Sequence, residues 1–176
     1  MGVQGGTMKL DSFKPTKSTF LTAERDIFNI VDKMLNNENL KKLLYYPVKD
    51  AYAQPNLTQE QSLSLIHKNI RVIPKIQIDE EVESYVIITF DGFTTNANNP
   101  EFRDNIITFD IICHMDTWVM NGYQLRPYKI MGEIDGMLNN QKLNGIGTTE
   151  FVSANQLLLN NELAGYTLMY RVVNDV

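Results

Sequence analysis

The side chains able to do acid–base, nucleophilic or metal chemistry are few, and their spacing does not bring them together. The chain has one cysteine, Cys113, and two histidines, His67 and His114, among 176 residues. Cys113 and His114 are neighbours in a β-branched run, so they point to opposite faces of a strand. Cys113 falls in the core-facing register, which predicts an inert buried thiol. His114 and Asp116 can share a face, where an exposed surface pair is the simpler interpretation than a catalytic one.

The carboxylates do not form a recognisable site either. Glu133 and Asp135 lie two positions apart on a predicted helix and therefore do not face each other. The run from Asp79 to Glu83 holds four carboxylates, but calcium loops space their ligands around Gly and Asn, so a solvated turn is favoured. The sequence contains no phosphate-binding loop, dinucleotide fingerprint or nucleophile elbow. We therefore expect a protein that is not an enzyme and that binds no metal and no cofactor.

Composition places the chain among ordinary globular proteins. It is 43% hydrophobic and 21% charged, with a net charge of −5. A nucleic-acid-binding surface needs clustered Lys and Arg, so an acidic balance argues against that main function. No stretch reaches the length of a membrane span, and the N-terminus lacks an apolar signal segment. A single cysteine cannot form an internal disulfide, which fits the reducing cytoplasm of a cell.

The element that organises the predicted fold is a long antiparallel hairpin between Ser84 and Met115. Tyr85 to Phe90 is an unbroken β-branched and aromatic run. In the second strand the odd positions from Ile107 to Met115 are all apolar, which predicts one core face and one half-solvated face. Turn-forming residues from Thr94 to Glu101 join the two strands in an overhanging loop.

Helical periodicity occurs in four other segments. Each has an apolar face and a recognisable start or stop, and they are Thr22–Leu35 with Thr22 as N-cap, Glu38–Tyr46, Thr58–Lys68 with a capping box, and Pro127–Leu138. Tyr45 and Tyr46 can serve as a binding platform or, as we favour, anchor a helix end. Gly132 and Gly136 lie four apart on the last helix, which predicts close packing there.

The remaining segments complete an α+β fold. A short edge strand is expected at Ile70–Ile76, a loop at Gln141–Thr148, and a strand pair at Glu150–Leu159 and Tyr166–Val173. The prediction is a mostly antiparallel sheet of about five strands with two or three helices packed on one face. Residues 1–19 form a flexible arm because they lack an apolar face, and residues 20–176 form one domain.

Several local patterns, in this order along the chain, resemble the tail-terminator and tail-completion proteins of tailed bacteriophages. The resemblance runs from about Asp26 to Val173 and rests on these segments: Arg71-Val72-Ile73-Pro74, Ser84-Tyr85-Val86-Ile87, Ile106 to Met115, Tyr128 to Leu138, and Leu168-Met169-Tyr170-Arg171. It implies an α+β structural protein of the phage neck, without catalytic residues, that forms a hexameric ring. Such a ring caps the tail tube, joins the tail to the head connector and lets DNA pass. It implies location in the virion after assembly in the bacterial cytoplasm.

Two alternatives to a tail terminator stay open. The long N-terminal arm and the Thr58–Lys68 helix also suit another neck component, such as a head-closure protein. A small-molecule-binding or enzymatic α+β domain would instead need convergent polar groups in a pocket, to which the sequence gives no pointer.

Contact residues follow from the overhanging loop. Aromatic side chains beside a polar loop tip suit an oligomer interface, and the candidates are Phe93, Asn96, Asn98, Phe102 and Arg103. Both aromatic rings can instead fold back onto their own sheet. Glu80, Glu81 and Glu83, if they line the ring's opening, would keep phosphates from binding as DNA passes.

Overall fold

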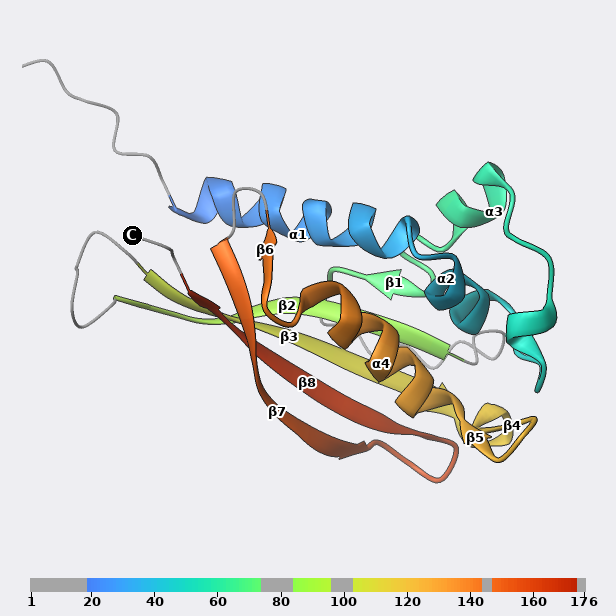
Figure 1. The fold of residues 1–176 in the computed structure, drawn as a ribbon. Helices are drawn as coiled ribbons and strands as arrows, with labels where there is room; N and C mark the ends of the chain where they lie inside the picture. Colours follow the sequence, from blue (N-terminus) through green and yellow to red (C-terminus); the bar gives the residue numbers. More distant parts are fainter. Residues whose placement is uncertain (1–18, 74–83, 96–102, 144–146, 174–176) are drawn as a thin grey trace, which may run out of the picture.

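A layer of helices covers one face of a six-stranded sheet in the computed structural model, which describes residues 19–73, 84–95, 103–143 and 147–173 (Figure 1). In spatial order the sheet consists of β1 (Ile70–Arg71), β2 (Ser84–Thr95), β3 (Arg103–His114), β8 (Leu163–Val173), β7 (Gly147–Leu158) and β6 (Gln141–Leu143). Only the β1–β2 pair is parallel. The predicted α+β class is confirmed, with one strand more than the expected five.

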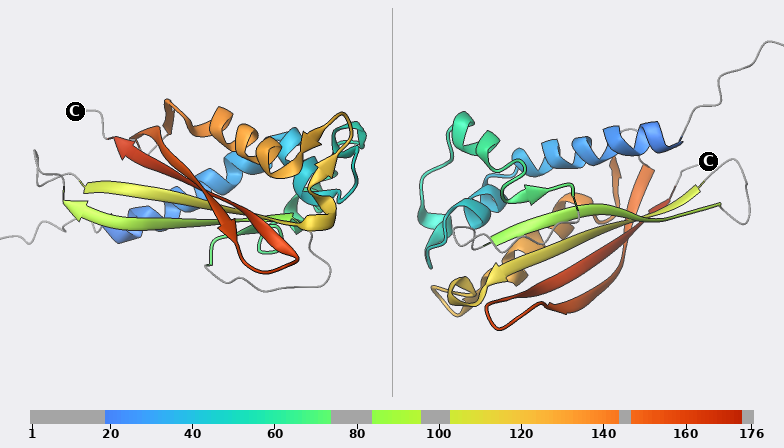
Figure 2. Two further views of the ribbon diagram at one scale, coloured as in Figure 1. Left: turned by 90° about the horizontal axis from the view of Figure 1, so that it is seen from below. Right: turned by 180° about the vertical axis from the view of Figure 1, so that it is seen from behind.

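Three helices form the layer over the sheet, and Figure 2 shows them on the same side in both views. They are α1 (Thr19–Leu35), α2 (Glu38–Tyr45) and α4 (Arg126–Leu138). The shorter elements lie around one end of the molecule: α3 (Gln59–Ser64), the 3₁₀ turns η1 (Ala51–Ala53) and η2 (Met115–Thr117), and a separate small ribbon of β4 (Val119–Met120) and β5 (Gln124–Leu125).

The β2–β3 hairpin carries the core, as its apolar alternation predicts. Ile107, Phe109, Ile111 and Cys113 are fully buried beneath the helices. The opposite face is only partly solvated, because Tyr85, Ile87, Ile112 and Leu163 form a second buried cluster there. Met115 was expected on the core face, but β3 ends at His114 and Met115 is exposed in the η2 turn.

The helix predictions are confirmed in position and corrected at their ends. Ile30, Val31 and Met34 form the buried face of α1, but the helix begins at Thr19, so Thr22 lies inside it and is not its N-cap. The predicted capping box is present at Thr58: the backbone N–H of Thr58 donates to the Gln61 side chain, and the Gln61 N–H donates to the Thr58 hydroxyl. Helix α3 ends at Ser64, earlier than expected.

Tyr45 and Tyr46 anchor the end of α2, as favoured. Their rings meet edge to face with centroids 5.0 Å apart, and both pack against the core. The segment after α4 differs from the prediction, since Gln141–Leu143 and Gly147–Thr149 pair as strands where a loop was expected.

The glycines needed for close packing are not those that the sequence indicated. A Cβ added at Gly132 or Gly136 meets no atom within 4 Å, and both residues face solvent, so the predicted close approach is wrong. At Gly165 on β8, a Cβ would lie 1.7 Å from the carbonyl oxygen of Ile111 on β3. Two central strands of the sheet therefore approach each other at a point that only glycine permits.

We expect Gly165→Ala to lower the free energy of unfolding by about 2 kcal/mol or more, because the strands must separate to admit the methyl group. The matched control, Gly132→Ala, should instead raise it by roughly 0.5–1 kcal/mol, since alanine is the better helix former. Urea denaturation followed by circular dichroism measures both. Equal stability of the two variants would contradict the close approach.

Candidate functional site

The groups that the sequence marked as reactive are placed in inert surroundings. Cys113 is fully buried, and burial raises the pKa of its thiol to about 12. Such a thiol stays protonated and unreactive at neutral pH. His114 Nδ1 lies 3.6 Å from an exposed carboxylate oxygen of Asp116 and accepts the Asp116 backbone N–H at 3.3 Å. The pair thus caps the η2 turn at the surface.

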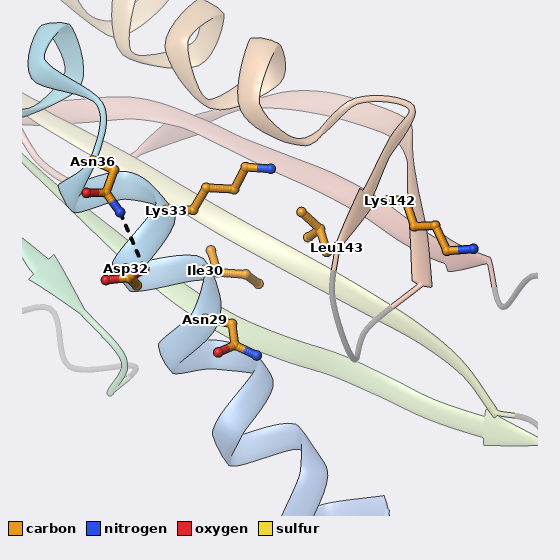
Figure 3. A pocket seen from close by; sticks show the side chains of 7 residues that line it. All are labelled: Asn29, Ile30, Asp32, Lys33, Asn36, Lys142 and Leu143. Atoms are coloured by element: carbon orange, nitrogen blue, oxygen red, sulfur yellow. Dashed lines mark hydrogen bonds between the residues drawn. The ribbon is translucent and has the colours of Figure 1, made fainter.

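A polar hollow of about 300 Å³ lies between α1 and β6 (Figure 3). Its lining consists of Asn29, Ile30, Asp32, Lys33, Asn36, Lys142 and Leu143. Only Ile30 and Leu143 are buried, and both are apolar; Asn36 donates to Asp32 at 3.4 Å along the same helix. The hollow therefore has an apolar floor and a solvated rim, without a buried polar group directed into it.

A second, wider hollow borders the outer part of β2 and has hydroxyl groups in its wall. Thr89 and Thr108 are hydrogen-bonded to each other at 2.5 Å, and Thr167 donates to Asp110 at 2.5 Å. These polar atoms satisfy one another across neighbouring strands, as in an ordinary sheet face. Among the described residues, no group of three or more His, Cys, Asp or Glu side chains could hold a metal ion.

The first candidate contact surface is the end of the β2–β3 hairpin, called here the projecting hairpin (residues 93–95 and 103–104). Pairing of β3 with β8 stops at Asn105, whereas β2 and β3 stay paired out to Thr95 and Arg103. A bulge between Asp91 and Phe93, with Gly92 at φ +70°, precedes this end. The hairpin therefore extends beyond the strands beside it, as expected from its length (Figure 1).

The second candidate surface lies at the opposite end of the molecule and was not predicted. Five exposed large side chains occur within fourteen residues around the β4–β5 ribbon and the start of α4. This surface, called here the apolar end, consists of Met115, Val119, Tyr123, Leu125 and Tyr128. Val119 and Leu125 face each other across the ribbon, and the Tyr128 hydroxyl is hydrogen-bonded to that of Tyr166 at 2.7 Å. Clustered exposed apolar residues mark contact sites more often than scattered ones do.

Tyr123 stands out within the apolar end. It occupies the tip of the β4–β5 ribbon, is fully exposed, and has the left-handed backbone conformation at φ 59° beside Gly122 at φ 73°. That conformation costs a bulky residue on the order of 1 kcal/mol, a strain typical of functional positions. A fully exposed aromatic ring at the tip of a hairpin has the properties of a binding anchor.

Arg126 fixes the apolar end to the rest of the fold. Its side chain is fully buried and donates to four backbone carbonyls: Leu43 at 2.6 Å, Tyr46 at 2.9 Å, Val48 at 2.6 Å and Thr117 at 2.9 Å. Leu43 and Tyr46 lie at the C-terminal end of α2, where carbonyls lack helical partners and the helix dipole favours a cation. The guanidinium thus joins α2, the η2 turn and α4.

A backbone contact completes this support. The N–H of Asn121, at the base of the ribbon tip, donates to the Lys49 carbonyl at 2.9 Å. Lys49 follows directly after Val48, whose carbonyl Arg126 binds. The position of Tyr123 therefore depends on a segment more than seventy residues earlier in the chain.

Six of the eight interface and channel residues expected from the sequence lie outside the described residues: Asn96, Asn98, Phe102, Glu80, Glu81 and Glu83. Phe93 and Arg103 belong to the ends of β2 and β3, within the projecting hairpin. Sequence periodicity does not reveal the apolar end, because β4 and β5 have only two residues each. The Asn121-Gly122 dipeptide, a strong hairpin-turn signal, is the feature that could have revealed it.

A protein-family comparison identifies the origin of the chain. The model of the YomW family matches residues 37–172, more than three quarters of the sequence. The chain belongs to the YomW family. This is a phage-derived family, associated with the yom locus of SPbeta-like Bacillus phages, so the phage character suggested by the sequence is confirmed. No curated protein and no solved structure matches. Within the described part of this YomW-family chain, no helix has the length and apolarity to cross a membrane.

Removing the guanidinium should destabilise the fold strongly. We expect Arg126→Met to lower the free energy of unfolding by roughly 3 kcal/mol or more, because buried carbonyls that lose their donor cost about 1–3 kcal/mol each. Arg126→Lys should have a free energy of unfolding between those of the wild type and Arg126→Met, since one ammonium group cannot replace the five N–H donors of a planar guanidinium. Arg171→Met removes one partner of an ion pair with Glu150 in which both side chains are exposed, so it should change stability by less than about 1 kcal/mol. Urea midpoints of the three variants test this, and an Arg126→Met midpoint equal to that of Arg171→Met would contradict it.

Proposed function

We propose that this YomW-family protein is a structural, non-catalytic component of the phage neck. In this role six copies form a ring that caps the tail tube and joins the tail to the head connector, and DNA passes through the opening. The observation that carries the proposal is the placement of two contact surfaces, the projecting hairpin and the apolar end, at opposite ends of the subunit (Figure 1). Membership of a phage-derived family supports the same role.

Opposite placement favours a ring over a two-fold dimer. When one surface of a subunit binds a different surface of the next, the contact is heterologous, and it closes into a ring if the rotation per subunit allows. The sheet runs between the two surfaces, so a contact at one end leaves the other end available. A rigid sheet also fixes the angle between successive subunits.

The chemistry of the two surfaces suits such a contact. The apolar end offers two tyrosines and three aliphatic or thioether side chains in a region with few charges. Aromatic residues and methionine are enriched at the centres of protein interfaces, and charged residues are depleted there. Tyr123 would enter the neighbouring subunit as the anchor, because its ring is fully exposed at the tip of the ribbon and makes a large aromatic contact area available.

A non-catalytic role agrees with the chemistry of the described residues. The thiol of Cys113 is buried, His114 caps a turn, and the lining of the α1–β6 hollow directs no buried polar group inward. The net charge of −5 supports a ring that DNA traverses without binding, since a fixed phosphate contact needs Lys or Arg.

The double substitution Val119→Ser/Tyr123→Gly should abolish ring assembly while leaving the subunit folded. Glycine relieves the left-handed strain at position 123, so stability should stay equal or rise by up to about 1 kcal/mol. Light scattering coupled to size exclusion should show the assembled mass fall to that of a smaller species. In phage carrying the double substitution, electron microscopy of lysates should show filled heads and separate tails.

Leu63→Ser on α3 is the matched control, because Leu63 is equally exposed but lies outside both contact surfaces. It should assemble and join heads to tails as the wild type does. Normal particles from the Val119→Ser/Tyr123→Gly phage would rule out the apolar end as a contact surface between subunits.

A further inference from the structure

The outer edge of the sheet at β7 is open over most of its length. Strand β6 pairs only with Gly147–Thr149, so among the described residues the part of β7 from Glu150 to Leu158 has a strand neighbour, β8, on one side only. Figure 1 shows this part of β7 at the border of the sheet, away from the helices. Seven residues, Val152–Leu158, make an edge of about 23 Å.

This edge lacks the features that usually prevent strand pairing. From Phe151 to Asn161 the sequence contains no Lys, Arg, Asp, Glu, Pro or Gly. Phe151, Val152 and Leu158 are exposed large hydrophobic residues within it. The β-bulge between Phe151 and Ser153 leaves Val152 without a partner on β8, so it affects only one end of the edge, and pairing with β8 is regular from Ser153 to Leu158. Proteins normally protect edges with charges, prolines or coverage, so a long uncharged edge indicates a surface that is covered by another strand.

We propose that this edge pairs with the same edge of a second copy of the chain, as two antiparallel β7 strands related by a two-fold axis. The two sheets then become one continuous sheet of twelve strands. The chemistry of the edge identifies a second copy as the partner, because an uncharged strand brings no like charges together when it meets itself, and its exposed apolar residues lie toward both ends.

The exposed apolar residues of the two strands lie opposite each other when the antiparallel register is centred on Asn155. It places Asn155 opposite the partner's Asn155, and Val152, near one end, opposite the partner's Leu158. A two-fold axis perpendicular to the sheet keeps facing residues on the same side, and this register satisfies that condition in the regularly paired part of β7, where Ser153 lies opposite the partner's Leu157. Val152 and Leu158 are both half exposed or more in the single subunit, so the pairing removes apolar surface from water at two symmetric places.

The pairing is independent of the proposed ring. The pairing uses the β7 edge of the sheet, whereas the ring uses the projecting hairpin and the apolar end. The two sets of surfaces share no residue. A subunit that cannot form rings can therefore still pair through β7, and a complete ring can bind a second ring through its β7 edges.

Charge substitution at the self-facing position tests the proposal. Asn155→Lys puts two lysines about 5 Å apart across the axis, and Asn155→Asp does the same with two carboxylates. Native mass spectrometry and sedimentation velocity should show each variant alone at half the assembled mass of the wild type. An equimolar mixture of the two variants should restore the full mass, with each assembly containing both variants equally.

Asn39→Lys and Asn39→Asp provide the matched control, since Asn39 is exposed on α2. These variants, alone or mixed, should keep the wild-type mass. The proposal is overturned if the Asn155 variants keep the wild-type mass, or if each is halved but the mixture stays halved. A wild type that is monomeric at every concentration also overturns it. None of these results depends on whether the ring forms.

Discussion

The buried guanidinium of Arg126 is the interaction on which the arrangement of this molecule depends. A charge removed from water is stabilised when its donors find acceptors, and here four backbone carbonyls accept hydrogen bonds from the guanidinium. Three of those carbonyls belong to residues 43–48 and one to Thr117, so the side chain holds together segments that are about eighty residues apart. The first residue of α4 is thereby fixed, and with it the ribbon that carries Tyr123.

The sheet connects the segments held by Arg126 to the other end of the subunit. Helix α4 packs its buried residues Ile130, Ile134 and Leu138 on the sheet, and Asp135 accepts a hydrogen bond from the buried Tyr170 hydroxyl at 2.9 Å. Burial, followed by the neighbouring carboxylate, raises the pKa of Tyr170 well above its usual range, so the hydroxyl remains a donor. The close approach at Gly165 joins β8 to β3. The apolar end and the projecting hairpin are therefore parts of one rigid frame.

Sequence patterns predicted the strands and helices that are long enough to show a periodic pattern of apolar residues. Alternation from Ile107 to Cys113 predicted β3, and the spacing of Ile30, Val31 and Met34 predicted α1, because burial on one face imposes a period. The short strands β4, β5 and β6 were missed, since two or three residues cannot establish a period. The glycine prediction on α4 was wrong because spacing alone does not say which side of a helix the glycines occupy.

One of the two candidate contact surfaces could also be predicted from the sequence, and the other could not. The projecting hairpin follows from strand length, so the sequence could indicate it. The role of Arg126 could not be predicted, because its acceptors are backbone carbonyls, which every residue has and which leave no trace in the sequence. Exposure of Tyr123 likewise depends on the fold around Asn121-Gly122 and not on residue type.

The central claim is that subunits join end to end, projecting hairpin to apolar end, into a closed ring. Disulfide trapping tests it most directly with Thr94→Cys, Leu125→Cys and the double variant, since the buried Cys113 thiol does not react under mild oxidation. The account predicts that each single variant stays monomeric on a non-reducing gel, whereas the double variant gives a ladder that ends at six subunits. A dimer from either single variant, or no ladder from the double variant, would contradict an end-to-end ring.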